Sequence, residues 1–217
     1  MKEGLISVIV PVLNEPGIGF FLEKLGDDLS TIIEGNEIIL VMGERETLRP
    51  EIPRLRNLKV AISYGDGLER AILTGFTMAS GEKLIVMDGD GSHDPRDVLR
   101  LAGELDRHEM VVGSRFLEGS VFQQSRARAL VSRFFIFWAR LNGSRLNDPM
   151  SGFFGIRREL LNRVRFKPFK WKICLEMELK ARPNISEIPI KFSKRSSGSS
   201  KSTLMIGIKI LFDLINK

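Results

Sequence analysis

The chain of 217 residues has few of the side chains that build disulfides and zinc sites, with one cysteine, Cys174, and two histidines. A lone cysteine excludes an internal disulfide framework and fits a reducing compartment. No uncharged apolar run approaches the ~20 residues that a bilayer-spanning helix needs, and there is no repeat or low-complexity tract. The first residues lead straight into a strand-like run, so we expect no secretory leader in this sequence.

The signatures of nucleic-acid binding are also absent. The net charge is +6 and the pI is about 9.6, a balance that suits nucleic acid, anionic lipid or phosphorylated substrates. The sequence up to residue 110 is rich in acids, whereas the excess of Lys and Arg follows Arg115. There is no aromatic-rich RNA-binding motif and no zinc-finger spacing, so we expect no nucleic-acid partner. No Gly-x-Gly-x-x-Gly follows the first predicted strand, which argues against a dinucleotide-dependent oxidoreductase.

Apolar runs alternate with helical patterns over the first half of the chain. They predict strands over 5–10, 37–42, 58–62, 83–87 and 110–113, and helices over about 18–33, 67–79 and 95–107. This alternation indicates an α/β fold with a mainly parallel central sheet covered on both faces. Beyond Arg115 we expect a helix over about 121–141, a strand over 151–156, a helix near 172–181, a strand over 185–192, a polar loop over 193–202 and an apolar segment over 204–215.

The segment Met87-Asp88-Gly89-Asp90-Gly91 places two carboxylates directly after a strand-like run. Open α/β folds bind ligands at the carboxyl ends of their strands. Two adjacent carboxylates repel each other unless a cation lies between them, and Mg²⁺ or Mn²⁺ shared with substrate phosphates suits such a pair. The alternative is an acidic strand-to-helix turn, with Asp94 as the N-cap and Pro95 at the first helical position.

Two segments of the second half have amphipathic patterns. In the helix predicted over 121–141, Arg126, Arg133 and Arg140 recur at a spacing of seven residues. Apolar side chains form a second, wide arc, which comprises Ala127, Val131, Phe134, Phe135, Ile136, Phe137, Trp138 and Leu141. We expect this helix and the C-terminal apolar segment to lie in a membrane interface. The alternative is that the two helices pack on each other or on a partner subunit.

Motifs spread over residues 5–202 occur in a recognisable order and spacing. They are Val10-Pro11-Val12-Leu13-Asn14-Glu15, Gly67-Leu68-Glu69-Arg70-Ala71, Gly75-Phe76, Ala79-Ser80-Gly81, Asp88-Gly89-Asp90, Gly113-Ser114-Arg115-Phe116, Asp148-Pro149-Met150-Ser151-Gly152-Phe153 and Arg195-Ser196-Ser197-Gly198-Ser199-Ser200-Lys201. Together they resemble the family 2 glycosyltransferases of the GT-A (Rossmann-like) fold. Within this family the chain is most similar to the dolichol-phosphate mannosyltransferases and related polyprenyl-phosphate glycosyltransferases, to which the last motif is the most specific.

The resemblance implies a role for each segment. The turn of Pro11, Leu13, Asn14 and Glu15, with Gly67, would bind the donor nucleoside. Asp88, Asp90 and Ser92 would hold Mg²⁺ or Mn²⁺ on the donor diphosphate, with Gly89 between the two acids as a further donor-binding residue. The basic residues around phosphates would be Arg115, Lys172, Arg195 and Lys201. Arg128 and Ser132, one turn apart on the long helix, would contact the acceptor phosphate. Each basic residue has the alternative of a solvated surface charge.

A lipid monophosphate acceptor needs no general base. Its second pKa is about 6, so it is largely a dianion at neutral pH and mainly needs positioning and charge screening. His93 could belong to the outer shell of the metal site, and His108 is expected at the surface. Asp148 is a candidate base, with a turn residue before Pro149 as the alternative. The resemblance implies inversion at the anomeric carbon in one in-line displacement.

The chain departs from the family pattern at two places. After the second predicted strand it has Val41-Met42-Gly43-Glu44-Arg45 where relatives carry an acidic pair that contacts the nucleoside, and Glu44 could substitute from a shifted position. Ser92 stands where relatives often have a glutamine, and it is a shorter ligand. Three alternatives therefore stay open: a saccharide acceptor, a nucleotide-sugar-binding regulatory subunit, and a degenerate paralogue without catalysis.

We expect a GT-A domain over 1–202, with the amphipathic helix over 121–141, and a C-terminal apolar helix over 203–217. The expected reaction moves a hexose from a nucleotide-sugar, GDP-mannose before UDP-glucose, to a polyprenyl (dolichyl) phosphate with Mg²⁺ or Mn²⁺ as cofactor. The expected location is cytoplasmic, peripheral to the cytoplasmic face of a membrane. A membrane-anchoring subunit and a second copy of the chain are further candidate partners.

Overall fold

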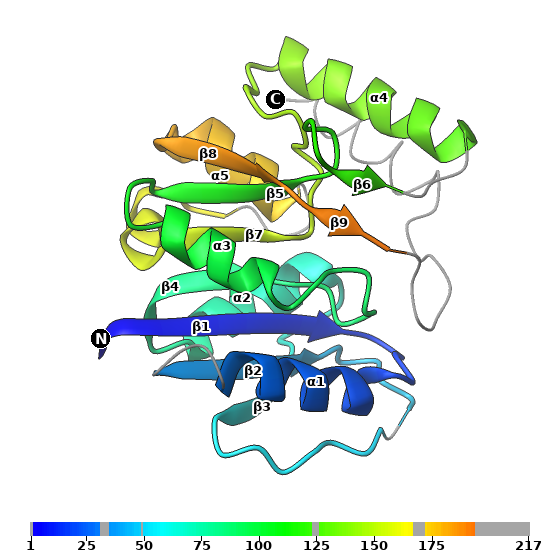
Figure 1. Cartoon of the computed structure of the whole chain (residues 1–217), viewed down its shortest axis with the longest axis vertical. Helices are drawn as coiled ribbons and strands as arrows, with labels where there is room; N and C mark the ends of the chain where they lie inside the picture. The colour runs from blue at the N-terminus through cyan, green and yellow to red at the C-terminus, as the bar shows by residue number, and fades with distance from the viewer. Residues whose placement is uncertain (1, 31–34, 49, 123–125, 167–171, 194–217) are drawn as a thin grey trace.

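The computed structural model describes residues 2–30, 35–48, 50–122, 126–166 and 172–193, without the side chains of 2, 3, 122 and 126–131. Within these residues a seven-stranded sheet has the order β3-β2-β1-β4-β7-β5-β8 (Figure 1). Its strands are β1 (Lys2–Val12), β2 (Asn36–Met42), β3 (Leu58–Ile62), β4 (Gly81–Val86), β5 (Met110–Ser114), β7 (Phe154–Arg157) and β8 (Ile185–Pro189). Only β7 runs antiparallel to its neighbours in this sheet, so the mainly parallel sheet expected from the sequence is confirmed.

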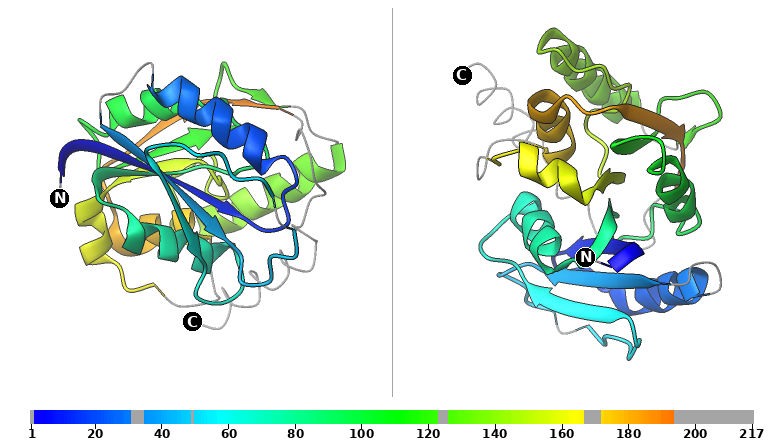
Figure 2. Two further views of the ribbon diagram at one scale, coloured as in Figure 1. Left: turned by 90° about the horizontal axis from the view of Figure 1, so that it is seen from below. Right: turned by 90° about the vertical axis from the view of Figure 1, so that its left-hand side faces the viewer.

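Helices cover both faces of the sheet. Helices α1 (Ile18–Ser30) and α3 (Asp97–Glu104) lie on one face, and α2 (Leu68–Met78) and α5 (Ile173–Ala181) lie on the other (Figures 1 and 2). Alternate side chains of β1 point to opposite faces. Val8 and Val10 therefore join the core under α1 and α3, whereas Ile9 joins the core under α2 and α5.

The predicted elements of the second half need three corrections. Residues 121–122 form a short strand, β6 (Val121–Phe122), and helix α4 is Arg126–Leu141. The strand expected over 185–192 is broken into β8 and β9 (Lys191–Phe192), and β9 pairs with β6 in a second sheet. The break follows Pro189, which has no N–H to continue the ladder. The strand expected from residue 151 begins at Phe154, because the Ser151 hydroxyl bonds to the Gly113 carbonyl and turns the chain there.

Other boundaries differ less. Strand β3 has the expected bounds, whereas α3 ends at Glu104, three residues before its expected end, and a 3₁₀ helix, η1 (Arg158–Arg163), follows β7. The expected loop from residue 194 and the apolar segment over 204–215 lie outside the described residues. In the part of the chain that is described, no helix is both long and apolar enough to cross a membrane.

The topology brings distant motifs to one edge of the sheet. Strands β1, β4 and β5 are parallel and end at this edge, and antiparallel β7 begins there. The segments 13–15, 88–92, 115–116 and 148–153 leave or enter the sheet at these strand ends. This is the edge at which open α/β folds bind ligands.

Candidate functional site

The acidic pair occupies the loop directly after β4. Asp90 is buried, and its Oδ1 accepts the Ser92 N–H at 3.0 Å, whereas the Asp88 side chain is 29% exposed. Gly89 separates the two acids for a steric reason. A Cβ at this position would lie 2.7 Å from Val12 Cγ1 and 2.9 Å from Ile18 Cδ1, so a larger residue would displace the loop from the core.

The donor atoms around the acidic pair fit a hard divalent cation. The Ser92 hydroxyl is buried and has no hydrogen-bond partner within the described residues. No group of three or more His, Cys, Asp or Glu side chains in the described ranges could hold a metal by itself. Among the described residues, Asp88, Asp90 and Ser92 would supply two carboxylates and one hydroxyl, and water and diphosphate oxygens would complete the shell, as Mg²⁺ sites commonly do.

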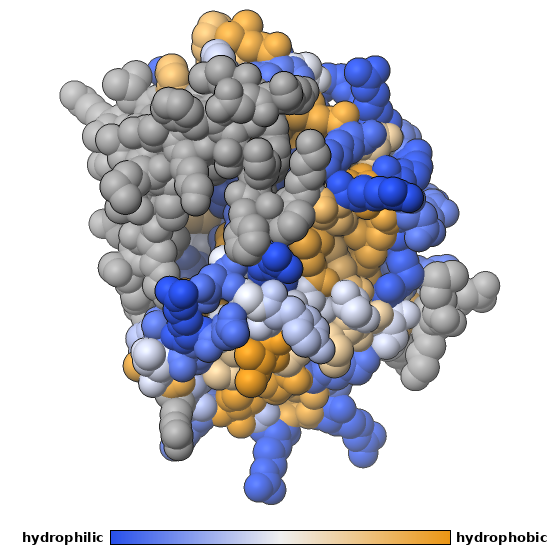
Figure 3. Space-filling model, turned by 180° about the vertical axis from the view of Figure 1, so that it is seen from behind, coloured by the Kyte–Doolittle hydropathy of each residue, from blue (hydrophilic) through white to orange (hydrophobic). Residues whose placement is uncertain are grey.

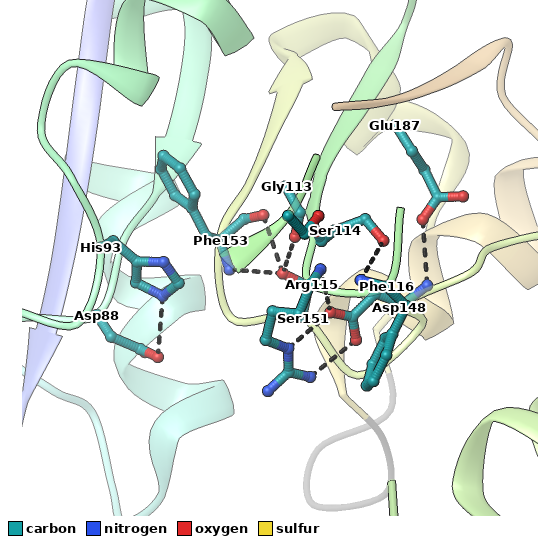
Figure 4. Close-up of polar contacts among 11 residues, drawn as sticks. Asp88, His93, Gly113, Ser114, Arg115, Phe116, Asp148, Ser151, Phe153 and Glu187 are labelled. Carbon is teal, nitrogen blue, oxygen red and sulfur yellow. Dashed lines mark hydrogen bonds and ion pairs between the residues drawn. The ribbon is translucent and has the colours of Figure 1, made fainter. Parts of the chain in front are cut away.

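Two neighbours lie close to the Asp88 carboxylate. His93 Nε2 lies 3.6 Å from Asp88 Oδ2 (Figure 4). Gly152 comes so close that a Cβ there would lie 2.7 Å from Asp88 Oδ2. The loop before β7 thus packs directly against the first acid of the pair.

Arg115, just after β5, is fixed by Asp148. Its backbone N–H and its Nε donate to Asp148 Oδ2 at 3.1 and 2.7 Å, and its Nη2 donates to Oδ1 at 2.8 Å (Figure 4). Asp148 is fully buried and the Arg115 side chain is 14% exposed. The rings of Phe116 and Phe192 each lie 5.5 Å from the guanidinium carbon. With both carboxylate oxygens bonded to Arg115, Asp148 is better placed to position that guanidinium than to act as a base.

The charge of Arg115 is secured by its acidic surroundings. Burial by itself lowers the pKa of the Arg115 guanidinium. The hydrogen bonds and charge of Asp148, together with the charge of Asp88, outweigh burial and raise this pKa above its ordinary value. The guanidinium is therefore a permanent positive charge within the electrostatic reach of Asp88, the first acid of the pair.

Sequence reasoning missed the residue that holds Asp148 in place. Glu187, on β8, accepts the Asn147 backbone and side-chain N–H groups at 2.8 Å each and the Asp148 N–H at 3.1 Å. Nothing in the local pattern distinguishes Glu187 from a solvent-facing acid on an edge strand. One signal was available: Glu187 lies among apolar residues in a predicted strand, and we expected helices to cover both faces of that sheet, so a charged side chain there needs a partner.

The Asn14 turn is locked to the segment after β2. Asn14 has a positive φ of 51°, and its Oδ1 accepts the N–H and hydroxyl of Thr47 at 2.8 and 2.9 Å. The Asn14 N–H donates to Glu46 Oε2 at 2.7 Å. Glu44, expected to replace the missing acidic pair, is exposed, and the acid that meets the turn is Glu46. The contact of Glu44 with a donor nucleoside stays a prediction, and Glu46 is a residue of this turn that the sequence reasoning did not single out.

The other expected donor contacts lie at the same edge. Pro11 is buried in β1, Leu13 is partly exposed, and the Glu15 carbonyl accepts the Ile18 N–H at the start of α1. Gly67 precedes α2 with a φ of 103°, a conformation that favours glycine. On the adjoining loops, Arg45 pairs with Asp66 at 2.8 Å.

Several expected phosphate contacts are only partly described. Ser132 is half-buried on α4, but the side chain of Arg128 on the preceding turn is outside the description. Lys172 is half-buried immediately before α5. Arg195 and Lys201 lie outside the described residues. The structure thus brings together Asp88, Asp90, Ser92 and Arg115 around one edge, and leaves these further roles as predictions.

Comparisons with known proteins agree with this arrangement. The profile of glycosyl transferase family 2 matches residues 7–165. Dolichol-phosphate mannosyltransferase of Pyrococcus furiosus is 29% identical over 209 residues, which cover 90% of this chain and 58% of that protein. The enzyme of the same name from Saccharomyces cerevisiae is 30% identical over 171 residues, which cover 73% of this chain and 63% of that protein. The chain thus spans about three fifths of the length of these two relatives.

A solved structure shares the fold at low sequence identity. Glucosyl-3-phosphoglycerate synthase from Mycobacterium tuberculosis, in complex with Mn²⁺, UDP-glucose and phosphoglyceric acid, superposes with a TM-score of 0.74 at 19% identity. The match covers 99% of this chain and 79% of that one. The family profile and the sheet order together identify the chain: it belongs to glycosyl transferase family 2 and has the GT-A fold.

Proposed function

We propose that this chain is an inverting glycosyltransferase that moves a hexose, mannose in the favoured case, from a nucleotide-sugar to a polyprenyl phosphate. The observation that carries the proposal is the acidic pair Asp88 and Asp90 at the carboxyl edge of the sheet, with Asp88 within electrostatic reach of the fixed guanidinium of Arg115. Relatives named dolichol-phosphate mannosyltransferase support the substrate class. A polyprenol monophosphomannose synthase of Mycolicibacterium smegmatis, 32% identical over 147 residues, supports it as well.

Asp88, Asp90 and Ser92 would hold Mg²⁺ or Mn²⁺, and structures of the mycobacterial synthase with either metal support a divalent cation. When bound, the metal supplies Lewis-acid stabilisation of the charge on the leaving diphosphate. The side chains of this protein would position the charged groups. Gly89 lets the loop that carries Asp88 and Asp90 lie close to the core, and Asp148 would hold the Arg115 guanidinium near the charge of the leaving diphosphate. Preorganised positive charge of this kind lowers the barrier most where negative charge develops.

The acceptor phosphate would attack the anomeric carbon directly. A bond forms between a phosphate oxygen and that carbon while the bond from the carbon to the diphosphate oxygen breaks, which inverts the configuration. Because the acceptor is largely a dianion at neutral pH, no side chain has to remove a proton. The buried carboxylate of Asp148 is consistent with this, because both of its oxygens accept hydrogen bonds from the Arg115 guanidinium.

The remaining roles follow the family pattern. The Asn14 turn, held by Glu46, would receive the donor nucleoside beside Gly67. We propose GDP-mannose as the donor ahead of UDP-glucose. Phosphate contacts from Lys172, Arg195 and Lys201, and acceptor contacts from Arg128 and Ser132, complete the proposal.

A peripheral membrane location is part of the proposal. On α4, Phe134, Phe137 and Leu141 are 51%, 60% and 62% exposed, and Arg133 and Arg140 are exposed beside them. Seen from behind, a small hydrophobic group lies at the top of the molecule, where α4 lies, and larger hydrophobic areas lie lower on the same face (Figure 3). Among the described side chains, the helix packs on α5 through a small cluster of Ala139, Trp138, Leu175 and Leu179. Exposed aromatic and arginine side chains on one helix suit an anionic membrane surface, which we place on the cytoplasmic side.

A transfer assay with varied donors tests the proposal. The chain is incubated with a polyprenyl phosphate, Mn²⁺ or Mg²⁺, and one radiolabelled nucleotide-sugar at a time. We expect a lipid-soluble product with GDP-mannose, no product in EDTA, and an anomeric configuration opposite to that of the donor. Retention of configuration, or full activity in EDTA, would refute the proposed mechanism.

A further inference from the structure

His93 is enclosed in the site and has no hydrogen-bond partner for either ring nitrogen within the described residues. Its side chain is 2% exposed. Its ring centroid lies 4.8 Å from that of Phe153 and 5.1 Å from that of Phe192. The backbone is fixed too, because His93 forms an isolated bridge with Phe192 and the Ser92 carbonyl accepts the Ser193 N–H at 2.9 Å. The plane of the imidazole is thus set by two aromatic rings and by the local strand pairing.

A carboxylate oxygen of Asp88 lies close to the imidazole of His93. His93 Nε2 lies 3.6 Å from Asp88 Oδ2, only slightly beyond hydrogen-bond distance. Buried ring nitrogens without a partner are uncommon in native proteins and call for a structural or functional reason. A shift of a few tenths of an ångström would close the Nε2–H···Oδ2 hydrogen bond. Catalytic hydrogen bonds are often long in a free enzyme and tighten when ligands bind.

We propose that His93 is a positioning residue for Asp88: His93 donates from Nε2–H to Asp88 Oδ2 and thereby fixes the orientation in which this carboxylate would hold the metal. This inference rests on the metal site proposed above. Gly152 also lies close to this carboxylate, because a Cβ at Gly152 would be 2.7 Å from Oδ2 and 3.1 Å from Oδ1. Carboxylate ligands of metals are commonly held by such hydrogen bonds, and loss of one weakens metal binding about 10- to 100-fold.

Side-chain geometry provides a matched set of variants. The amide nitrogen of a glutamine lies close to the position of imidazole Nε2, so His93→Gln keeps the donor. The amide of an asparagine corresponds to Nδ1 and stops short of Asp88, so His93→Asn loses it. His93→Phe keeps the ring contacts with Phe153 and Phe192 and has no donor at all. His108→Phe, at a half-buried histidine after α3, is the control for a change of the same size elsewhere.

The measurement is a titration of the free protein with Mn²⁺ alone, in which unbound Mn²⁺ is read by electron paramagnetic resonance. We expect His93→Phe and His93→Asn to raise the Mn²⁺ dissociation constant about tenfold or more. We expect His93→Gln and His108→Phe to stay close to wild type. Thermal unfolding of each variant confirms that the fold is retained.

Two results would overturn the positioning role. The first is wild-type Mn²⁺ affinity in His93→Phe, and the second is a His93→Gln variant that folds but binds as weakly as His93→Phe. Asp90→Ala separates this inference from the proposed function. If Asp90→Ala binds Mn²⁺ like wild type, the metal site itself is wrong and the role of His93 fails with it. If Mn²⁺ binding follows the expected order but no sugar is transferred, only the proposed reaction fails.

Discussion

Arg115 and Asp148, which are 33 residues apart in the chain, are joined by three hydrogen bonds at the carboxyl edge of the sheet. Two of them are the parallel pair that a guanidinium makes with a carboxylate, a geometry that an ammonium group cannot reproduce. Glu187 holds the Asp148 backbone from β8, so the position of the guanidinium depends on a chain of contacts across two strands. Arg115 is therefore a preorganised charge with little freedom to move.

The first prediction concerns this pair. Arg115→Lys keeps the charge but loses the paired geometry, and Asp148→Asn keeps the shape but loses the charge. Each should lower the rate of sugar transfer about 100-fold at saturating donor, because a misplaced charge near the reacting atoms costs about that much. Arg96→Lys is the control, since Arg96 makes the same paired contact with Asp94 on the exposed surface. Unimpaired transfer by Arg115→Lys would show that the paired geometry has no catalytic role.

The second prediction concerns the approach of Gly152 to the acidic pair. Gly152→Ala adds a Cβ that would meet Asp88 Oδ2 at 2.7 Å, so the carboxylate or the loop has to move. We expect Mn²⁺ affinity and transfer to fall about tenfold each. Gly103→Ala is the matched control, because a Cβ on this α3 glycine meets nothing within 4 Å. Wild-type Mn²⁺ binding in Gly152→Ala would count against a metal at Asp88.

The third prediction is a pH dependence of stability at the other end of the sheet. Glu37 on β2 accepts hydrogen bonds from the Ser7 hydroxyl, the Lys59 ammonium and the Ser80 N–H. Burial by itself raises the pKa of Glu37, but Lys59, Ser7 and Ser80 together lower it below the ordinary value of 4.5. A lowered pKa in the folded state stabilises the fold above the unfolded-state pKa, and this contribution is lost as the pH falls through the folded-state pKa.

Glu37→Gln should therefore lower the free energy of unfolding by about 2 kcal/mol at pH 7. The difference from wild type should shrink as the pH falls below about 4.5, because the wild-type carboxylate is then protonated too. Urea unfolding between pH 3 and pH 7 measures this, with Glu23→Gln on the exposed side of α1 as the control. A difference that does not change with pH would show that the charge of Glu37 contributes nothing.

The fourth prediction concerns the exposed face of α4. The double variant Phe134→Ser/Phe137→Ser should bind anionic liposomes at least about tenfold more weakly, since each buried aromatic ring contributes about 1.5–3 kcal/mol. Salt should weaken the wild-type binding as well, because Arg133 and Arg140 lie beside these rings. Ile62→Ser is the control: Ile62 is 66% exposed, on edge strand β3 at the far side of the sheet. Equal flotation of all three proteins would remove α4 from the membrane interface.

The sequence predicted the first half of the sheet well because buried parallel strands are continuous apolar runs. The run 58–62 coincides with β3, and the acids of 88–90 follow β4 directly. The second half was harder, because single hydrogen bonds set its boundaries. Neither the turn at Ser151 nor the break after Pro189 changes the apolar pattern on which the prediction depends.

The candidate site was only partly visible in the sequence for a related reason. Motif residues such as Asp88 and Asp90 stand at a strand end, and that position alone indicates their role. The partners Asp148 and Glu187 come from elements far along the chain, and their contacts exist only once β7 and β8 lie beside β5. Local spacing also did not single out Glu46, because its contact with the Asn14 N–H depends on how the loop after β2 folds onto Asn14.

The most direct test of the account is transfer of radiolabelled mannose from GDP-mannose to a polyprenyl phosphate in the presence of Mn²⁺, with wild type and Asp90→Ala compared side by side. A saccharide mixture serves as the competing acceptor. We expect label to enter the lipid fraction with wild type, and this transfer to disappear in EDTA and in Asp90→Ala. Label that enters the saccharides and leaves the lipid phosphate untouched, or an Asp90→Ala variant as active as wild type, would contradict it.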